Sequence, residues 1–169
     1  MPRFASETSV PVERSRAEIE ALVVKYGATQ FNSGWTPNAA QIAFQLKDLW
    51  IRFVLPLPDK GGDKFKFKVV KGKWMTIKKP LTTKQSADRY EQEIRSRWRA
   101  LALVVKAKLE AVECGISTLE NEFLAFIVLP GTAFTVGEWM RDNAMEAIRG
   151  GESPLMIGPA PLKVVEDNR

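Results

Sequence analysis

The chain has 169 residues, of which 45% are hydrophobic and 27% are charged, a composition typical of globular proteins. The single cysteine, Cys114, excludes an internal disulfide framework and a cysteine-rich zinc site, and favours a reducing, intracellular setting. Histidine is absent, which removes the usual general base at neutral pH and the Ser-His and Cys-His nucleophile pairs. No apolar run approaches the roughly 20 residues of a membrane span, so we expect no membrane association.

The net charge of +5 is divided unevenly along the chain. Residues 60–84 carry nine lysines against one acidic residue, whereas residues 115–169 carry four basic and eight acidic residues. The two other segments, 1–59 and 85–114, are close to neutral. The basic character therefore belongs to one segment and not to the protein as a whole.

Four helix starts are predicted by one local pattern. A Ser or Thr is followed three residues later by Glu or Gln, so that the two residues satisfy each other's free backbone N–H groups. The pairs are Ser15 with Glu18, Thr82 with Gln85, Ser117 with Glu120, and Thr135 with Glu138. The expected helices span about residues 16–26, 83–114, 118–127 and 136–149, and Gly27 ends the first of them.

Strands are expected between the first two helices. Residues 41–47 and 49–55 both alternate apolar and polar side chains, which predicts an antiparallel hairpin that turns at Lys47-Asp48. A shorter strand near residues 29–33 is expected to join this sheet. Pro56 and Pro58 then end the ladder, because proline has no N–H to donate.

The helix expected over 83–114 is longer than the rest of the domain requires. Its apolar residues recur at an average step of about 3.6, so they stay on one side of a nearly straight helix. At roughly 1.5 Å per residue it spans close to 48 Å. One end must project or meet a partner, and a homodimer through this helix is one candidate arrangement.

A second hairpin is expected over residues 64–79, around Lys71-Gly72-Lys73. Phe65, Phe67 and Val69 would face one way, and the intervening lysines the other. We interpret this segment as a basic β-arm, partly detached from the sheet.

Together these elements predict an α+β fold. A small antiparallel sheet with a basic β-hairpin arm is packed by one long central helix and three shorter helices. Residues 1–150 form the single domain, the arm occupies 60–80, and residues 151–169 form a tail broken by Pro and Gly.

Four segments of the chain form a recognisable pattern: VPVERSRAEIEALVVKYGA, IRFVLPLP, RWRALALVVKAKLEAVECGISTLENEFLAFIVLP and TVGEWM. This pattern resembles a family of small uncharacterised proteins encoded in bacteriophages and prophages. The resemblance covers about two thirds of the chain, whereas the segment 60–84 and the LPGTAF turn depart from the family pattern. It implies a phage-related origin and a location in the cytoplasm of the bacterial host. Because no activity is established for the family, it transfers no catalytic residue.

The basic arm is the main candidate site, because clustered cations with interleaved aromatic rings neutralise phosphates and stack on bases. Its candidate residues are Lys64, Lys66, Lys68, Lys71, Lys73, Lys78 and Lys79, with Phe65, Phe67 and Trp74 as stacking groups. The alternative is an amphipathic hairpin whose lysines protect an exposed edge from aggregation.

Arg95 and Arg99 on the long helix are candidate helpers to the arm. Glutamates are interspersed along the same helix, which favours a solvated face with pairs of opposite charge four residues apart. A metal nuclease would need clustered carboxylates to hold Mg²⁺, from Asp48, Glu110, Glu113, Glu120 and Glu122. Neither a phosphate-binding loop nor a nuclease motif is visible, so we expect neither catalysis nor a cofactor. Trp35, Trp50 and Trp74 lie outside the expected helices and serve either packing or a partner contact.

The sequence therefore predicts a non-catalytic phage accessory protein that binds nucleic acid with little sequence specificity. The alternative is a protein-binding module that modulates a host or phage enzyme, as a host-takeover or anti-defence factor does.

Overall fold

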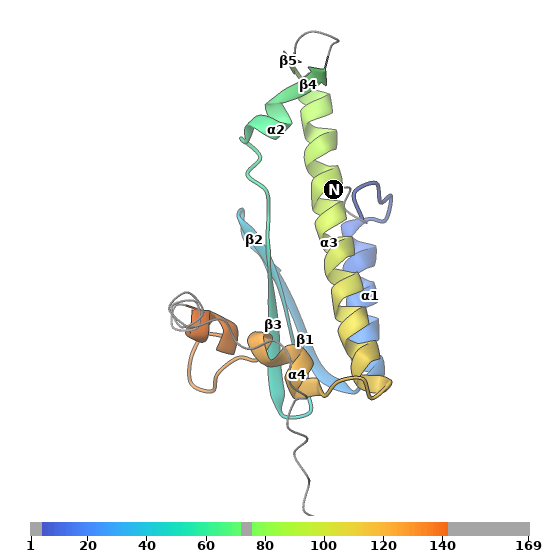
Figure 1. Ribbon diagram of the computed structural model, residues 1–169, viewed down its shortest axis with the longest axis vertical. Helices are drawn as coiled ribbons and strands as arrows, with labels where there is room; N and C mark the ends of the chain where they lie inside the picture. The colour runs from blue at the N-terminus through green and yellow to red at the C-terminus, as the bar shows by residue number, and fades with distance from the viewer. Residues whose placement is uncertain (1–4, 72–75, 142–169) are drawn as a thin grey trace, which may run out of the picture.

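A computed structural model of the chain describes residues 5–71 and 76–141. The elements in chain order are α1 (Val12–Lys25), β1 (Ala28–Trp35), β2 (Ala39–Leu46), β3 (Leu49–Pro56), α2 (Asp63–Lys66), β4 (Phe67–Lys71), β5 (Thr76–Pro80), α3 (Thr83–Glu113), α4 (Leu119–Phe123) and the 3-10 turn η1 (Leu124–Phe126). The strands β1-β2-β3 form an antiparallel sheet, and α1 and α3 lie side by side on one of its faces (Figure 1). The α+β fold and the long helix are confirmed.

The core lies between the sheet and the two helices. Phe44 is opposite Ile51, and Ile42 is opposite Phe53, so all four side chains share the inner face, where they are buried. The hairpin between β2 and β3 turns at Lys47-Asp48, as the alternation predicts. Lys47 takes the positive φ of 53° that the turn needs, a position where Gly is commoner.

The first helix begins earlier than its expected Ser15–Glu18 cap. It starts at Val12, with Pro11 at the N-cap and without a side-chain capping bond. Proline fixes φ near the helical value and has no N–H to satisfy, so the helix begins directly after it. Ser15 is therefore fully buried on the same face as Ile19, and its Oγ bonds to no described residue.

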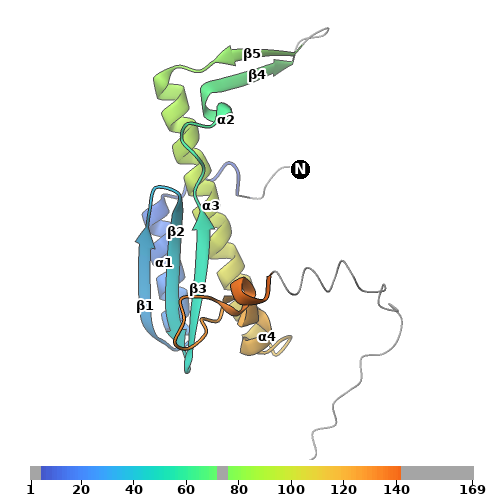
Figure 2. The same cartoon turned by 90° about the vertical axis from the view of Figure 1, so that its left-hand side faces the viewer.

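Helix α3 begins at Thr82, where both hydrogen bonds of the predicted capping box with Gln85 are present. Its 31 residues correspond to about 46 Å, whereas an eight-residue strand of the sheet extends only about 27 Å. The N-terminal turns of α3 therefore run past the sheet (Figure 2). This overhang is where the structure places the second hairpin.

The third helix starts one residue later than expected. Thr118, and not Ser117, caps α4, because its Oγ1 accepts a hydrogen bond from the Asn121 N–H at 3.2 Å. The Ser117 N–H is still bonded to Ala111 O at the end of α3, so a new helix cannot begin there. The expected single helix also divides into α4 and the 3-10 turn. Phe123 of α4 packs edge-on against Phe44 and closes the core beside β3.

The fourth capping box is confirmed. The Thr135 N–H donates to the Glu138 carboxylate at 2.8 Å, and the Glu138 N–H donates to Thr135 Oγ1 at 3.2 Å. Residues 136–141 are helical, and the same carboxylate bonds Arg52 of β3 at 2.6 Å. Glu138 thus attaches this helix to the face of the sheet opposite α3 (Figure 1). The remainder of the expected helix and the tail at 151–169 lie outside the described residues.

Glu138 should make part of the stability depend on acid pH. The hydrogen bond from the Thr135 backbone and the charge of Arg52 hold the pKa of its carboxyl below the ordinary value of 4.5. The stabilisation is therefore present above about pH 4.5 and is lost as the pH falls below it. We expect Glu138→Gln to lower the free energy of unfolding at pH 7 by at most about 1 kcal/mol, since the pair is partly exposed.

The measurement is thermal unfolding between neutral and acid pH. The Glu138→Gln variant should lose less stability on acidification than the unchanged protein. Glu120→Gln is the matched control, because Glu120 is exposed on α4 and forms no ion pair with a described residue. Equal acid sensitivity of all three proteins would contradict the role given to Glu138.

Candidate nucleic-acid interface

The hairpin β4–β5 carries its lysines on both faces. Lys68 is directly opposite Lys79, and Lys78 is opposite Val69. Like charges directly opposite each other destabilise a strand pair. The arm therefore holds a charge arrangement that its own stability does not favour.

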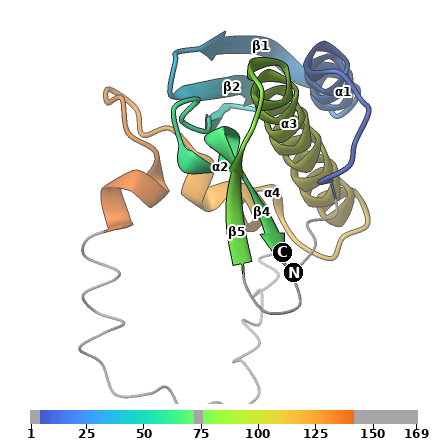
Figure 3. The same ribbon diagram turned by 90° about the horizontal axis from the view of Figure 1, so that it is seen from above.

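The arm extends to one side from the overhanging end of α3 (Figures 2 and 3). A two-stranded hairpin is at best marginally stable alone in water, so it needs an anchor. Phe65 provides one: its side chain is 1% exposed, and its ring meets Tyr90 of α3 edge-on, with 5.3 Å between the ring centres. Phe65 is therefore withdrawn from the predicted stacking groups, because its ring has no face available to a base.

The strand expected from residue 64 is instead the short helix α2, and the hairpin begins at Phe67. In this helix the Lys64 ammonium lies 3.3 Å from the Glu93 carboxylate of α3. Arg89, which is also in α3, donates a hydrogen bond to the Phe67 carbonyl at 3.2 Å. Lys64 thus helps to hold α2 on α3, which corrects its predicted alternation with Phe65. Its place among the phosphate contacts stays a prediction.

Four of the candidate lysines remain available to an outside anion. Lys66, Lys68 and Lys79 are exposed, and none pairs with a described carboxylate. Lys78 lies 3.8 Å from Asp63, but the two side chains are 65% and 76% exposed, so water screens the pair.

The other candidates in the arm are incompletely described. Lys71 ends β4, and its side chain is not among those described. Lys73 and Trp74 lie outside the described residues. Phe67 is half-buried at the start of β4.

The structure does not bring Arg95 and Arg99 into the arm. Arg95 donates to Gln92 at 2.8 Å and lies 3.6 Å from Glu91, four residues earlier. Arg99 pairs with Glu18 of α1 and joins the two helices. Both guanidinium groups are therefore used within the protein, as the solvated-face interpretation of this helix implies.

The carboxylates considered for Mg²⁺ are dispersed. Glu110 accepts a hydrogen bond from the Tyr26 hydroxyl at 3.0 Å, and Glu122 pairs with Lys108 at 3.2 Å. Within residues 5–71 and 76–141, no three Asp, Glu, Cys or His side chains gather where they could hold a metal ion.

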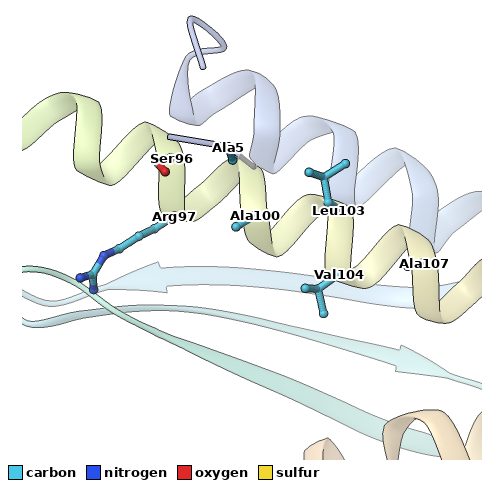
Figure 4. A pocket seen from close by; sticks show the side chains of 7 residues that line it. All are labelled: Ala5, Ser96, Arg97, Ala100, Leu103, Val104 and Ala107. Carbon is cyan, nitrogen blue, oxygen red and sulfur yellow. The ribbon is translucent and has the colours of Figure 1, made fainter. Parts of the chain in front are cut away.

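A shallow apolar groove of about 460 Å³ runs along α3 (Figure 4). Ala100, Leu103, Val104 and Ala107 line it, and Ala5 closes one end. A homodimer through the long helix would use this face, and it stays a prediction. No helix in the described part of the chain has the length and apolar character needed to cross a bilayer.

Comparisons of the chain with protein-family models, with curated proteins and with solved structures found no match. The geometry of the arm and of its surroundings therefore carries the functional argument.

Sequence reasoning missed that Tyr90 and Glu93 anchor the arm. A signal was present, because the apolar stripe of the long helix extends to Tyr90, beyond the reach of strands of about 27 Å. Some other apolar side chain would therefore be expected to cover Tyr90, and Phe65 is one of the large ones in the preceding segment.

Removing the anchor should release the arm without unfolding the core. Phe65→Ala deletes a fully buried ring, a change that costs about 3–5 kcal/mol within a core. We expect faster hydrogen exchange of the β4, β5 and early α3 amides, with little change near Leu109. Val69→Ala is the control in the same hairpin, because Val69 is 55% exposed. Equal exchange in the two variants would show that Phe65 is not the anchor.

The opposed lysine pair gives a second test. Lys68→Glu places a carboxylate opposite Lys79, so the hairpin should gain about 0.2–1 kcal/mol. Hydrogen exchange of the β4 and β5 amides should slow. The same substitution should weaken binding of a polyanion, because the local charge changes by two. Slower exchange with unchanged binding would contradict a binding role for this pair.

Proposed function

We propose that the chain is a non-catalytic accessory protein that binds nucleic acid with little sequence specificity through its β4–β5 arm. The supporting observation is a set of four exposed lysines, one at the end of α2 and three on the projecting β4–β5 ribbon. Three of the four have no described carboxylate partner. Phosphates would contact Lys66, Lys68, Lys78 and Lys79. The opposed pair Lys68–Lys79 would become favourable once a phosphate neutralises it.

Low specificity follows from the side chains of the arm. The segment 67–80 contains no Asn, Gln or Arg, the residues that most often read base edges. Lysine acts as a compact point charge, which suits phosphate contacts without fixing a sequence. The proposed action as a phage accessory protein in the bacterial cytoplasm rests on the sequence resemblance alone.

The second candidate is a protein-binding module that acts on a host or phage enzyme with an acidic surface. Two exposed apolar residues of the arm favour it, Val69 at 55% and Ile77 at 44%. Contacts with phosphates would leave both apolar side chains exposed to water, whereas a protein partner would bury them.

Gel-shift titrations over a range of salt concentrations test the proposal. The triple variant Lys66→Glu, Lys68→Glu, Lys79→Glu removes three phosphate contacts. The dependence of log affinity on log salt should flatten by about 2 to 3, because each contact contributes about 0.7 for single strands and 0.9 for duplex DNA. Binding of the variant should become weak at about 0.1 M salt.

A matched control changes the same number of charges elsewhere. Arg14, Lys25 and Lys106 are exposed on α1 and α3, and their replacement by Glu lowers the net charge equally. If both triple variants lose affinity alike, net charge and not the arm governs binding. If the unchanged protein binds no nucleic acid at low salt, the nucleic-acid proposal fails, and the acidic-protein candidate takes its place.

A further inference from the structure

A pocket of about 370 Å³ with aromatic walls lies beside the part of α3 that anchors the arm. It opens where the β1–β2 turn, the start of α1 and the middle of α3 meet. Trp35, Tyr90 and Trp98 contribute its three aromatic side chains. Its volume falls within the range of about 300–1,000 Å³ that is usual for small-molecule sites.

Tyr90 connects this pocket to the arm. One part of its ring packs against Phe65, the anchor of the arm, and the residue also lines the pocket. The Lys60 ammonium lies 5.8 Å from the centre of the same ring. Tyr90 therefore links the anchor of the arm to a wall of the pocket.

Trp35 is placed for stacking. Its side chain is 79% exposed, although it lies beside a pocket with two other aromatic walls. The turn that follows it is held by the Thr36 N–H, which donates to Ala39 O at 2.7 Å, and by the Leu57 N–H, which donates to Asn38 O at 2.8 Å. The indole is thus presented at the end of a fixed strand and not on a loose loop.

Two charged side chains at the start of α1 complete the lining. Arg16 and Glu13 are exposed at the pocket, and neither pairs with a described residue. A guanidinium donates to base carbonyl and ring-nitrogen acceptors or to phosphate, and a carboxylate accepts from an exocyclic amine. The pocket therefore offers flat apolar walls together with a donor and an acceptor, the combination that an unpaired nucleobase requires.

We propose that the pocket takes an unpaired base of a single-stranded nucleic acid whose phosphates lie along the arm, with Trp35 as the stacking residue. This inference rests on the function proposed for the arm and adds the substrate class, single strands in preference to duplexes. Bases inside a duplex are stacked on each other and cannot enter without being unpaired. The arm alone would bind single strands and duplexes alike, whereas the pocket would take a base only from a single strand.

The test compares two single-stranded probes of about 15 nucleotides, a length within the usual site size. One is oligothymidylate, and the other is an abasic strand with the same phosphates and no bases. Trp35→Ala should raise the Kd for oligothymidylate by about 5- to 150-fold, the usual cost of losing one stacking ring. The salt dependence should not change, because no charge is removed. The Kd for the abasic strand should also stay the same.

The controls separate stacking from general damage. Trp35→Phe keeps a ring and should recover most of the affinity. Trp139→Ala removes another exposed indole, 60% exposed and outside the pocket, and should have no effect on binding.

The two proposals fail in different ways. If the unchanged protein binds neither probe, the function proposed for the arm fails. If it binds both probes through the arm lysines, but Trp35→Ala matches the unchanged protein on oligothymidylate, the pocket inference alone is overturned. The same holds if Trp35→Ala weakens binding to the abasic strand equally.

Discussion

The architecture depends on a mismatch of length between one helix and the sheet it covers. Helix α3 has 31 residues and each strand of the sheet has eight, which leaves about 20 Å of helix without a sheet beneath it. The end of a helix gains most of its stability from packing of its apolar face, and at this end that face includes Tyr90. Phe65 packs on Tyr90, and it carries the β4–β5 hairpin with it. The position of the arm thus follows from the need to cover the end of α3.

Arginines and arm lysines have different uses in this protein. Every arginine of α3 is bonded within the protein: Arg89 to the Phe67 carbonyl, Arg95 to Gln92 and Glu91, Arg97 to Glu93 and the Pro56 carbonyl, and Arg99 to Glu18. The planar guanidinium suits such fixed contacts, whereas the flexible ammonium of lysine keeps its hydration. The ammonium groups of Lys66, Lys68 and Lys79 have no described carboxylate partner and are open to solvent or to a binding partner. The arginines of residues 95–99 therefore stabilise the fold. Among the candidate site residues, the cations without a described carboxylate partner are lysines of the arm.

The sequence predicted the features that neighbouring residues determine. The capping boxes at Thr82 and Thr135, the alternation of β2 and β3 and the end of α1 at Gly27 were all recognisable, because each depends on residues within a few positions. The two helix starts that were wrong were decided by residues just outside the expected capping pair. Ser117 is still bonded to the end of α3, and Ser15 is buried within a helix that Pro11 begins.

The site was less accessible to sequence reasoning, because its contacts join residues that are far apart in the sequence. Phe65 meets Tyr90, 25 positions later in the chain, and the pocket gathers residues from Val12 to Trp98, so neither leaves a local pattern. The lysine cluster was visible in the composition, but its separation into an anchoring Lys64 and free neighbours was not. Period-two alternation could not indicate the helical turn α2, which rotates Phe65 onto α3.

In the proposed binding, the arm and the pocket would supply different parts of recognition. A cluster of lysines attracts any polyanion, including acidic proteins, and the attraction weakens as salt screens it over about 10 Å at 0.1 M. Stacking on an indole is short in range, insensitive to salt, and specific for flat rings. Tyr90 lies between the two, since it supports the anchor of the arm and lines the pocket. Because the helix end that positions the cations also forms a wall of the pocket, a polyanion held by the arm would be distinguished from others by whether it carries a base to insert.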